Sequence, residues 1–203
     1  MTNLKSQHGF TLLELLIATT VFSVILLLIT VGLINIGKSY YKGSNQARTQ
    51  AVARNVIDEI SRGIQFSGSD ITTTTGIGGG KFYFCLNGAT YAYIINSQLN
   101  ATGKVLIAQD NATCASPITD VATANGRELL TQGMRLLELN VSESAPSVYT
   151  VTVSVGIGGN AGEFFDPANY PAHLDKTTCK TGSDGQFCTV SKLSTTVVQR
   201  IRL

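Results

Sequence analysis

The chain has 203 residues, 43% of them hydrophobic and 14% charged, and a formal net charge of +2. Residues 67–203 hold nine Lys or Arg against ten Asp or Glu, so this part is nearly neutral and no specific nucleic-acid partner is predicted. The length accommodates one globular domain in addition to a membrane-spanning segment.

The first element is an apolar run from Phe10 to Gly37 with a single charged residue, Glu14. An α-helix rises about 1.5 Å per residue, so the uncharged stretch 15–37 is long enough to cross a hydrocarbon core of about 30 Å. A charge inside such a span costs on the order of 2.5 to 3.5 kcal/mol. We therefore expect Glu14 to have a cationic partner.

The residues around Glu14 resemble a known processing signal. The string Lys5-Ser-Gln-His-Gly9-Phe10-Thr-Leu-Leu-Glu14 is similar to the N-terminal signal of the type IV pilin and pseudopilin family. The resemblance implies a leader, residues 1–9, that prepilin peptidase removes between Gly9 and Phe10 before Phe10 is N-methylated. It also implies that Glu14 binds the amino terminus of a neighbouring subunit, because two paired charges cost less in a low-dielectric bundle than either alone.

An ordinary signal anchor is the alternative, with Glu14 in the first helical turn and favoured there by the helix dipole. A secretory signal is cut after its apolar core, whereas the cut expected here precedes the core. The apolar run then stays on the mature protein. We expect a single-pass cytoplasmic (inner) membrane protein before assembly and an extracellular or periplasmic filament afterwards.

Charge alone does not decide on which side of the membrane the C-terminal domain lies. Lys5 precedes the span, whereas Lys38, Lys42 and Arg48 follow it, which argues against a C-terminal domain outside the cytoplasm. Large domains, however, translocate largely regardless of charge, and four cysteines fit an oxidising compartment. We therefore expect the C-terminal domain outside the cytoplasm, as the family resemblance also implies.

The second half of the helix, residues 38–66, is expected to be amphipathic. Its apolar residues recur every three or four positions and predict one face that packs on a sheet; they are Ala53, Val56, Ile57, Ile60 and Ile64. Three glycines weaken the helix between residues 32 and 43. This is where we expect it to bend or melt on packing into a filament.

The head, residues 67–203, has the pattern of a β-rich domain. Residues 67–80 read as a loop, and strands are expected at 81–86, 91–95, 105–108, 134–141, 148–155 and 192–203, with an Asn87-Gly88 hairpin and a turn at 142–147. Tyr149, Val151, Val153 and Val155 should share a buried face. The predicted fold class is α+β: a long N-terminal hydrophobic helix whose C-terminal half packs on an antiparallel β-sheet head, as in pilins.

The cysteines in the head, Cys85, Cys114, Cys179 and Cys188, form an even set. We expect two disulfides; sequence allows three connectivities, and the nearest-neighbour pairing is favoured. His173 is the only histidine left after leader removal, so a zinc site is not expected. Asp175 and Asp184 could contribute to a calcium site, although their order does not match an EF-hand. No cofactor and no metal ligand are predicted.

Two sequence features invite catalytic interpretations that fail. The string from Gly76 to Lys81 resembles a phosphate loop, but its glycines are one residue too close and Phe82 stands where Ser or Thr is needed. A single histidine offers no Ser, His and acid arrangement. We predict that the chain is not an enzyme.

The predicted function is a structural subunit, a minor pilin of a type IV pilus. Leu129-Leu130 and Gly133-Met134 are similar to J-type or W-type minor pilins. The alternatives are a pseudopilin of a type II secretion or DNA-uptake system, and a membrane-tethered binding domain with a simple signal anchor. The predicted partners are other pilin or pseudopilin subunits, the prepilin peptidase/methyltransferase, and the inner membrane before assembly. The aromatic residues of the loop 156–186 offer either a partner surface or a cover for the core.

Overall fold

The structure, a computed structural model, describes residues 11–68, 71–86, 88–110, 118, 120–158, 179 and 187–200. It divides into two compact units, one ending at Tyr40 and the other beginning at Tyr41. A single helix, α1 (Leu12–Gln65), contributes to both.

In the first unit, α1 carries exposed large apolar side chains from Leu12 to Ile36. The helix is long and apolar enough to cross a membrane, judged by length and composition. It is continuous through Gly32 and Gly37. The break expected on filament packing stays a prediction, since it concerns the assembled subunit.

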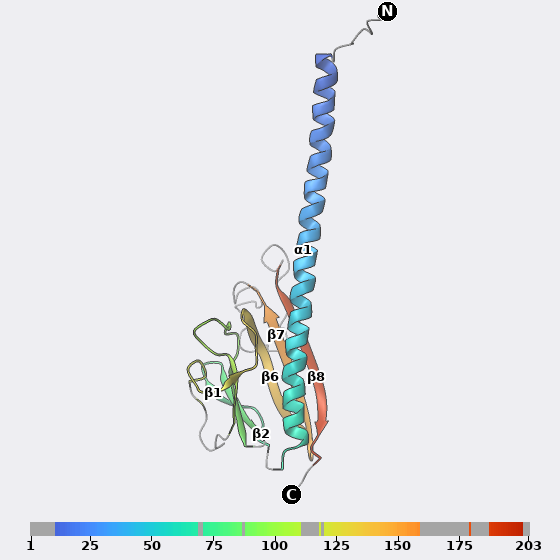
Figure 1. Ribbon diagram of the computed structural model, residues 1–203. Coiled ribbons are helices and arrows are strands. Elements are labelled where there is room, and N and C mark those ends of the chain that lie inside the picture. The colour runs from blue at the N-terminus through green and yellow to red at the C-terminus, as the bar shows by residue number, and fades with distance from the viewer. Residues whose placement is uncertain are drawn as a thin grey trace, which may run out of the picture. The chain divides into compact units, whose positions relative to one another are not determined.

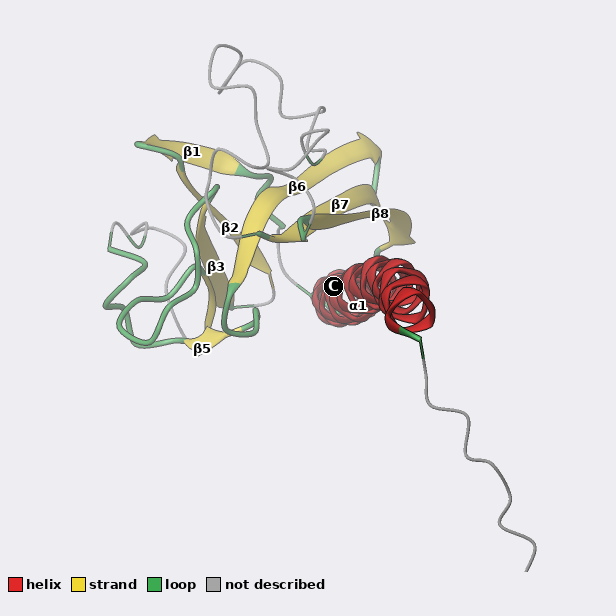
Figure 2. Ribbon diagram, turned by 90° about the horizontal axis from the view of Figure 1, so that it is seen from above, coloured by secondary structure: helices red, strands yellow, loops and turns green. Residues whose placement is uncertain are grey.

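The second unit contains two antiparallel sheets. Sheet A has the order β1-β2-β3-β4-β5, and sheet B has the order β6-β7-β8. The strands are β1 (Thr75–Gly78), β2 (Lys81–Leu86), β3 (Ala89–Ile94), β4 (Leu106–Asp110), β5 (Arg127–Glu128), β6 (Met134–Ala145), β7 (Val148–Ile157) and β8 (Thr189–Val198). Figures 1 and 2 both show β6, β7 and β8 side by side along the C-terminal part of α1. The α+β class with a helix on antiparallel sheets is therefore confirmed.

Two strands were missed from the sequence. Residues 67–80 are not all loop, because β1 pairs antiparallel with β2. The glycines that mimic a phosphate loop make the connection between these strands: Gly78, Gly79 and Gly80 all have positive φ, which glycine adopts without a Cβ clash. The other missed strand, β5, is only two residues long and pairs with β4.

Other boundaries also shift. The turn between β6 and β7 is shorter than the expected 142–147, since the strands continue to Ala145 and restart at Val148. The closing strand is displaced toward the N-terminus: β8 spans Thr189–Val198, not 192–203. Residues 201–203 lie outside the described part of the chain.

The core forms where the apolar stripe of α1 meets both sheets. All five predicted stripe residues are buried, and Ile60 and Ile64 are fully inaccessible. They belong to one hydrophobic cluster with β2, β3, β6 and β7 side chains such as Phe84 and Val153. The predicted buried face of β7 is confirmed, but Ser154 on the opposite face is buried as well.

Backbone hydrogen bonds join the two sheets. Thr74 donates its amide to the Val141 carbonyl at 3.1 Å, and the Val141 amide donates back to Thr74 Oγ1 at 2.9 Å. In the core, the Tyr93 hydroxyl donates to the Leu139 carbonyl, and burial raises the pKa of this tyrosine. These hydrogen bonds connect the segment before β1, and β3, to β6.

Candidate assembly site and head surfaces

The first turn of α1 is closed by a reciprocal pair, Thr11 and Glu14. The Thr11 amide and the Thr11 hydroxyl each donate to Glu14 Oε2 at 2.9 Å. In return, the Glu14 amide donates to Thr11 Oγ1 at 3.3 Å. This arrangement is a capping box, in which an N-cap hydroxyl and a carboxylate three residues later satisfy each other's backbone donors.

The capping box leaves part of the carboxylate available. Within the described residues, every hydrogen bond to the Glu14 side chain ends on Oε2, and the side chain is exposed. Oε1 can therefore accept from a cation while Oε2 holds the helix end. The Thr-x-x-Glu spacing was a readable signal for Thr11 as the N-cap, and sequence reasoning missed it.

Hydroxyl groups along the span are satisfied within the helix. Thr19, Thr20, Ser23 and Thr30 each donate to a backbone carbonyl three or four residues earlier, at 2.8 to 3.0 Å. Such bonds remove the cost of an unpaired polar group in hydrocarbon. The hydroxyl groups therefore need no partner outside the helix. By sequence, Glu14 is the one ionisable residue within the described residues 11–37.

The remaining processing residues are Gly9 and Phe10. Both lie outside the described part of the chain, so the expected cleavage site stays a prediction.

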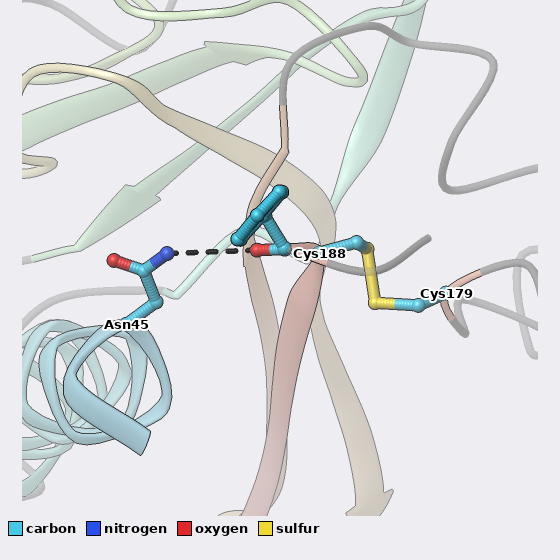
Figure 3. The surroundings of a disulfide bond; sticks show 4 residues. Asn45, Cys179 and Cys188 are labelled. Atoms are coloured by element: carbon cyan, nitrogen blue, oxygen red, sulfur yellow. Dashed lines mark hydrogen bonds between the residues drawn. A yellow bond between two sulfur atoms is a disulfide. The ribbon is translucent and has the colours of Figure 1, made fainter. Parts of the chain in front are cut away.

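One of the two nearest-neighbour disulfides, Cys179–Cys188, is formed, with a Cα–Cα distance of 5.7 Å. Cys188 is fully buried and belongs to a small cluster with Leu137 of β6. Figure 3 shows Asn45 of α1 reaching toward this segment, where its Nδ2 donates to the Phe187 carbonyl at 3.5 Å. The disulfide therefore lies where β8 begins.

The first predicted disulfide is only partly described. Cys85 is fully buried in β2 and is disulfide-bonded, whereas Cys114 lies outside the described residues. Asp175 and Asp184, the candidate calcium ligands, also lie outside them. Among the residues that are described, no group of three or more His, Cys, Asp or Glu could hold a metal ion.

A polar groove of about 430 Å³ opens between the helix and sheet A. Its lining comes from one exposed side of α1, from β3 and from β5; the residues are Asn55, Asp58, Glu59, Arg62, Tyr91 and Arg127. Arg127 Nη2 forms an ion pair with Glu59 Oε1 across it. The groove therefore holds charges of both signs.

Comparison with known proteins gives one finding. No curated protein and no solved structure matches the chain. Residues 4–30 match the family model described as the prokaryotic N-terminal methylation motif, and this stretch contains Gly9, Phe10 and the Thr11–Glu14 capping box. The chain therefore carries a type IV pilin-like prepilin signal at the head of a helix able to span a membrane.

Proposed function

We propose that this chain is a structural subunit of a type IV pilus. Its leader is removed after Gly9, and Phe10 is N-methylated. The Glu14 carboxylate then forms an ion pair with the amino group of Phe10 in a neighbouring subunit. The main support is the exposed carboxylate of Glu14, which lies inside the matched methylation motif. Its Oε1 accepts no hydrogen bond from the residues that the structure describes, since both hydrogen bonds to this side chain end on Oε2.

The chemistry makes leader removal a switch for assembly. Before cleavage the Phe10 nitrogen is an uncharged amide, and only the cut creates a cation at that atom. The new amine and Glu14 are each costly in hydrocarbon and together nearly neutral, so their pairing drives association of subunits within the membrane. The capping box holds the carboxylate in place before the partner arrives.

Two features of the head support this role. Its disulfide at Cys179–Cys188 favours a domain outside the cytoplasm. A minor pilin is the assignment that the Leu129-Leu130 and Gly133-Met134 resemblance favours. A pseudopilin of a secretion or DNA-uptake system uses the same signal and is the second candidate.

Intact-protein mass spectrometry tests the processing. Mature protein should begin at Phe10 and carry one additional methyl group on its amino terminus. Retention of residues 1–9 in the mature protein would refute the proposal and support a plain membrane anchor.

Two substitutions of Glu14 separate charge pairing from helix capping. Glu14→Val should insert into the membrane normally but fail to enter filaments. Glu14→Gln keeps a side-chain oxygen for Thr11 but has no charge, so it should fail as Glu14→Val does. Ser23→Val, in the same span, is the matched control and should incorporate normally. Normal incorporation of Glu14→Gln would show that capping alone suffices and would remove the proposed pairing.

A further inference from the structure

The strand β8 forms one end of sheet B and, among the described strands, pairs only with β7. All ten of its residues pair with β7 in one continuous register, without a bulge. Figure 2 shows β8 at the outer end of the sheet, with no other described strand beyond it. A long and regular edge strand presents a row of unpaired backbone groups, which favours pairing with another chain.

The register identifies which backbone groups of β8 face outward. In an antiparallel pair, residues that bond to the partner strand alternate with residues whose amide and carbonyl point away from it. The Gln199 amide donates to the Ser147 carbonyl at 2.9 Å. This pair is the next one after Val148 with Val198 in the register, so the odd-numbered residues of β8 bond to β7. The outward groups belong to the even-numbered residues Val190, Lys192, Ser194, Thr196 and Val198.

The other edges of the two described sheets are short, bulged or already bonded. The strand β1 has four residues and a bulge where it pairs with β2, and β5 has two residues. The outer edge of β6 is bonded to the rest of the head. There the Asn96 amide donates to the Leu136 carbonyl at 2.8 Å, and the Leu99 amide donates to the Met134 carbonyl at 2.9 Å. No such bond reaches the outward groups of β8 from the residues that the structure describes.

The side chains of β8 define the two faces that a partner strand would meet. The Ser191 hydroxyl lies 2.9 Å from the Thr49 hydroxyl of α1, so the odd-numbered side chains face the helix. Leu193, on this side, is half-buried against the hydrophobic core. Lys192 is the one charged residue of β8 and lies on the opposite face, where its Nζ pairs with Glu138 Oε2 at 2.7 Å. A partner strand should therefore alternate, with apolar residues beside Leu193 and polar residues beside Lys192.

We propose that the outer edge of β8 binds an extended strand from a different subunit of the same assembly. This inference rests on the proposed filament function. An extended backbone offers donors and acceptors in alternation at the spacing of a strand edge. A second copy of this chain does not fit, because one edge meets the same edge of another copy only about a two-fold axis, and a filament of parallel subunits has none. The other described edges of a copy are short, bulged or bonded, so the strand comes from a different chain.

Residue-resolved hydrogen exchange tests the pairing by comparing the full chain in detergent with the same chain in purified filaments. The outward amides of β8 should exchange at least about tenfold more slowly in filaments, whereas the odd-numbered amides bond to β7 in both states and should change little. Outward amides that exchange equally fast in both states overturn the proposal. Outward amides that are already protected in the purified chain would show that this chain, or a second copy of it, covers the edge, which also overturns the proposal.

Substitutions of Ser194, in the middle of β8, separate backbone pairing from side-chain contact. Ser194→Pro removes one outward amide and leaves the bonds to β7, since proline is tolerated on the open side of an edge strand. Filament incorporation should fall about tenfold, because the partner's carbonyl loses its donor. Ser194→Ala keeps the amide, so it is the matched control and should incorporate normally. An equal loss in Ser194→Ala would assign the contact to the hydroxyl and overturn the backbone pairing.

The outcomes separate this inference from the proposed function. If wild-type protein keeps its leader or never enters filaments, the proposed function itself fails. If wild-type protein enters filaments but Ser194→Pro incorporates as well as Ser194→Ala does, only the strand pairing is overturned. Thermal unfolding of both variants in detergent should stay close to that of wild type. Should the proline variant unfold, hydrogen exchange of the wild-type protein decides between the two results given above.

Discussion

Glu128 in β5 is predicted to be the most important carboxylate for the stability of the head. It accepts hydrogen bonds from three backbone amides: Val105 to Oε2 at 2.7 Å, Leu106 to Oε1 at 3.1 Å, and Leu130 to Oε1 at 3.0 Å. Val105 and Leu106 are buried. Glu128→Ala therefore leaves three backbone donors without their acceptor, two at the start of β4 and one just after β5.

The size of the effect follows from these bonds. A hydrogen bond to a charged group contributes about 1.5 to 3 kcal/mol, and an unsatisfied buried donor costs about 1 to 3 kcal/mol. The Glu128 side chain is half-buried, so water can reach part of the site and the lower end applies. About 1 kcal/mol for each amide gives a loss of about 3 kcal/mol, or a fall in Tm of about 6 to 12 °C for a protein of this size.

Thermal unfolding of the full chain in detergent measures this loss. Glu128→Gln keeps one side-chain oxygen but turns an amide group toward one of the donors, so it should lose about half as much. Glu143→Ala is the control, since exposed Glu143 accepts, among the described residues, only from the Ser147 amide, at 3.3 Å. A Glu128→Ala protein as stable as Glu143→Ala would refute the reasoning.

Three further outcomes are expected. Cys188→Ser opens a disulfide of sequence separation 9, and denaturant titration of the oxidised proteins should show a loss of about 2 to 3 kcal/mol by the chain-entropy relation. Ile60→Ala removes a fully buried side chain from the helix–sheet core and should cost about 2 to 5 kcal/mol in the same titration, whereas exposed Gln50→Ala should cost little. The Thr123 hydroxyl donates to Asp120 Oδ2 at 2.6 Å and holds the pKa of Asp120 below its usual value. The stability that ionised Asp120 contributes is therefore present above its unfolded-state pKa and is lost as pH falls through its folded-state pKa. Thr123→Val should raise the pKa of Asp120 toward its usual value in an NMR titration, and an unchanged pKa would contradict this cause.

The sequence predicted the parts of the fold that periodicity controls. The apolar stripe ending at Ile64 and the alternation around Val153 are local patterns, and a helix or strand with one buried face requires them. For the same reason Glu14 stood out from the sequence, because a lone charge in an apolar run is expensive wherever the run folds. The Thr11 partner was readable from the same string and was overlooked.

What the sequence did not predict depends on contacts between distant residues. The strand β5 has two residues and no period of its own, and it forms because Glu128 binds backbone amides near residue 105. The glycines around Gly79 were interpreted as loop because this stretch is rich in Gly, Ser and Thr, and such residues mark turns equally inside and outside a hairpin. Ser154 is buried on the face of β7 opposite Val153, and the alternation along β7 did not predict this burial.

The carboxylates of this chain differ in how much of their acceptor capacity the subunit itself uses. Glu128 binds three of its own backbone amides, so it has little left for a partner, and its role is to hold the fold. Glu14 binds through Oε2 alone, and exposed Asp58 has no ion pair among the described residues. Because an unused, exposed carboxylate gains most from a new cation, a carboxylate such as that of Glu14 is where contact with a neighbour would change the free energy of assembly.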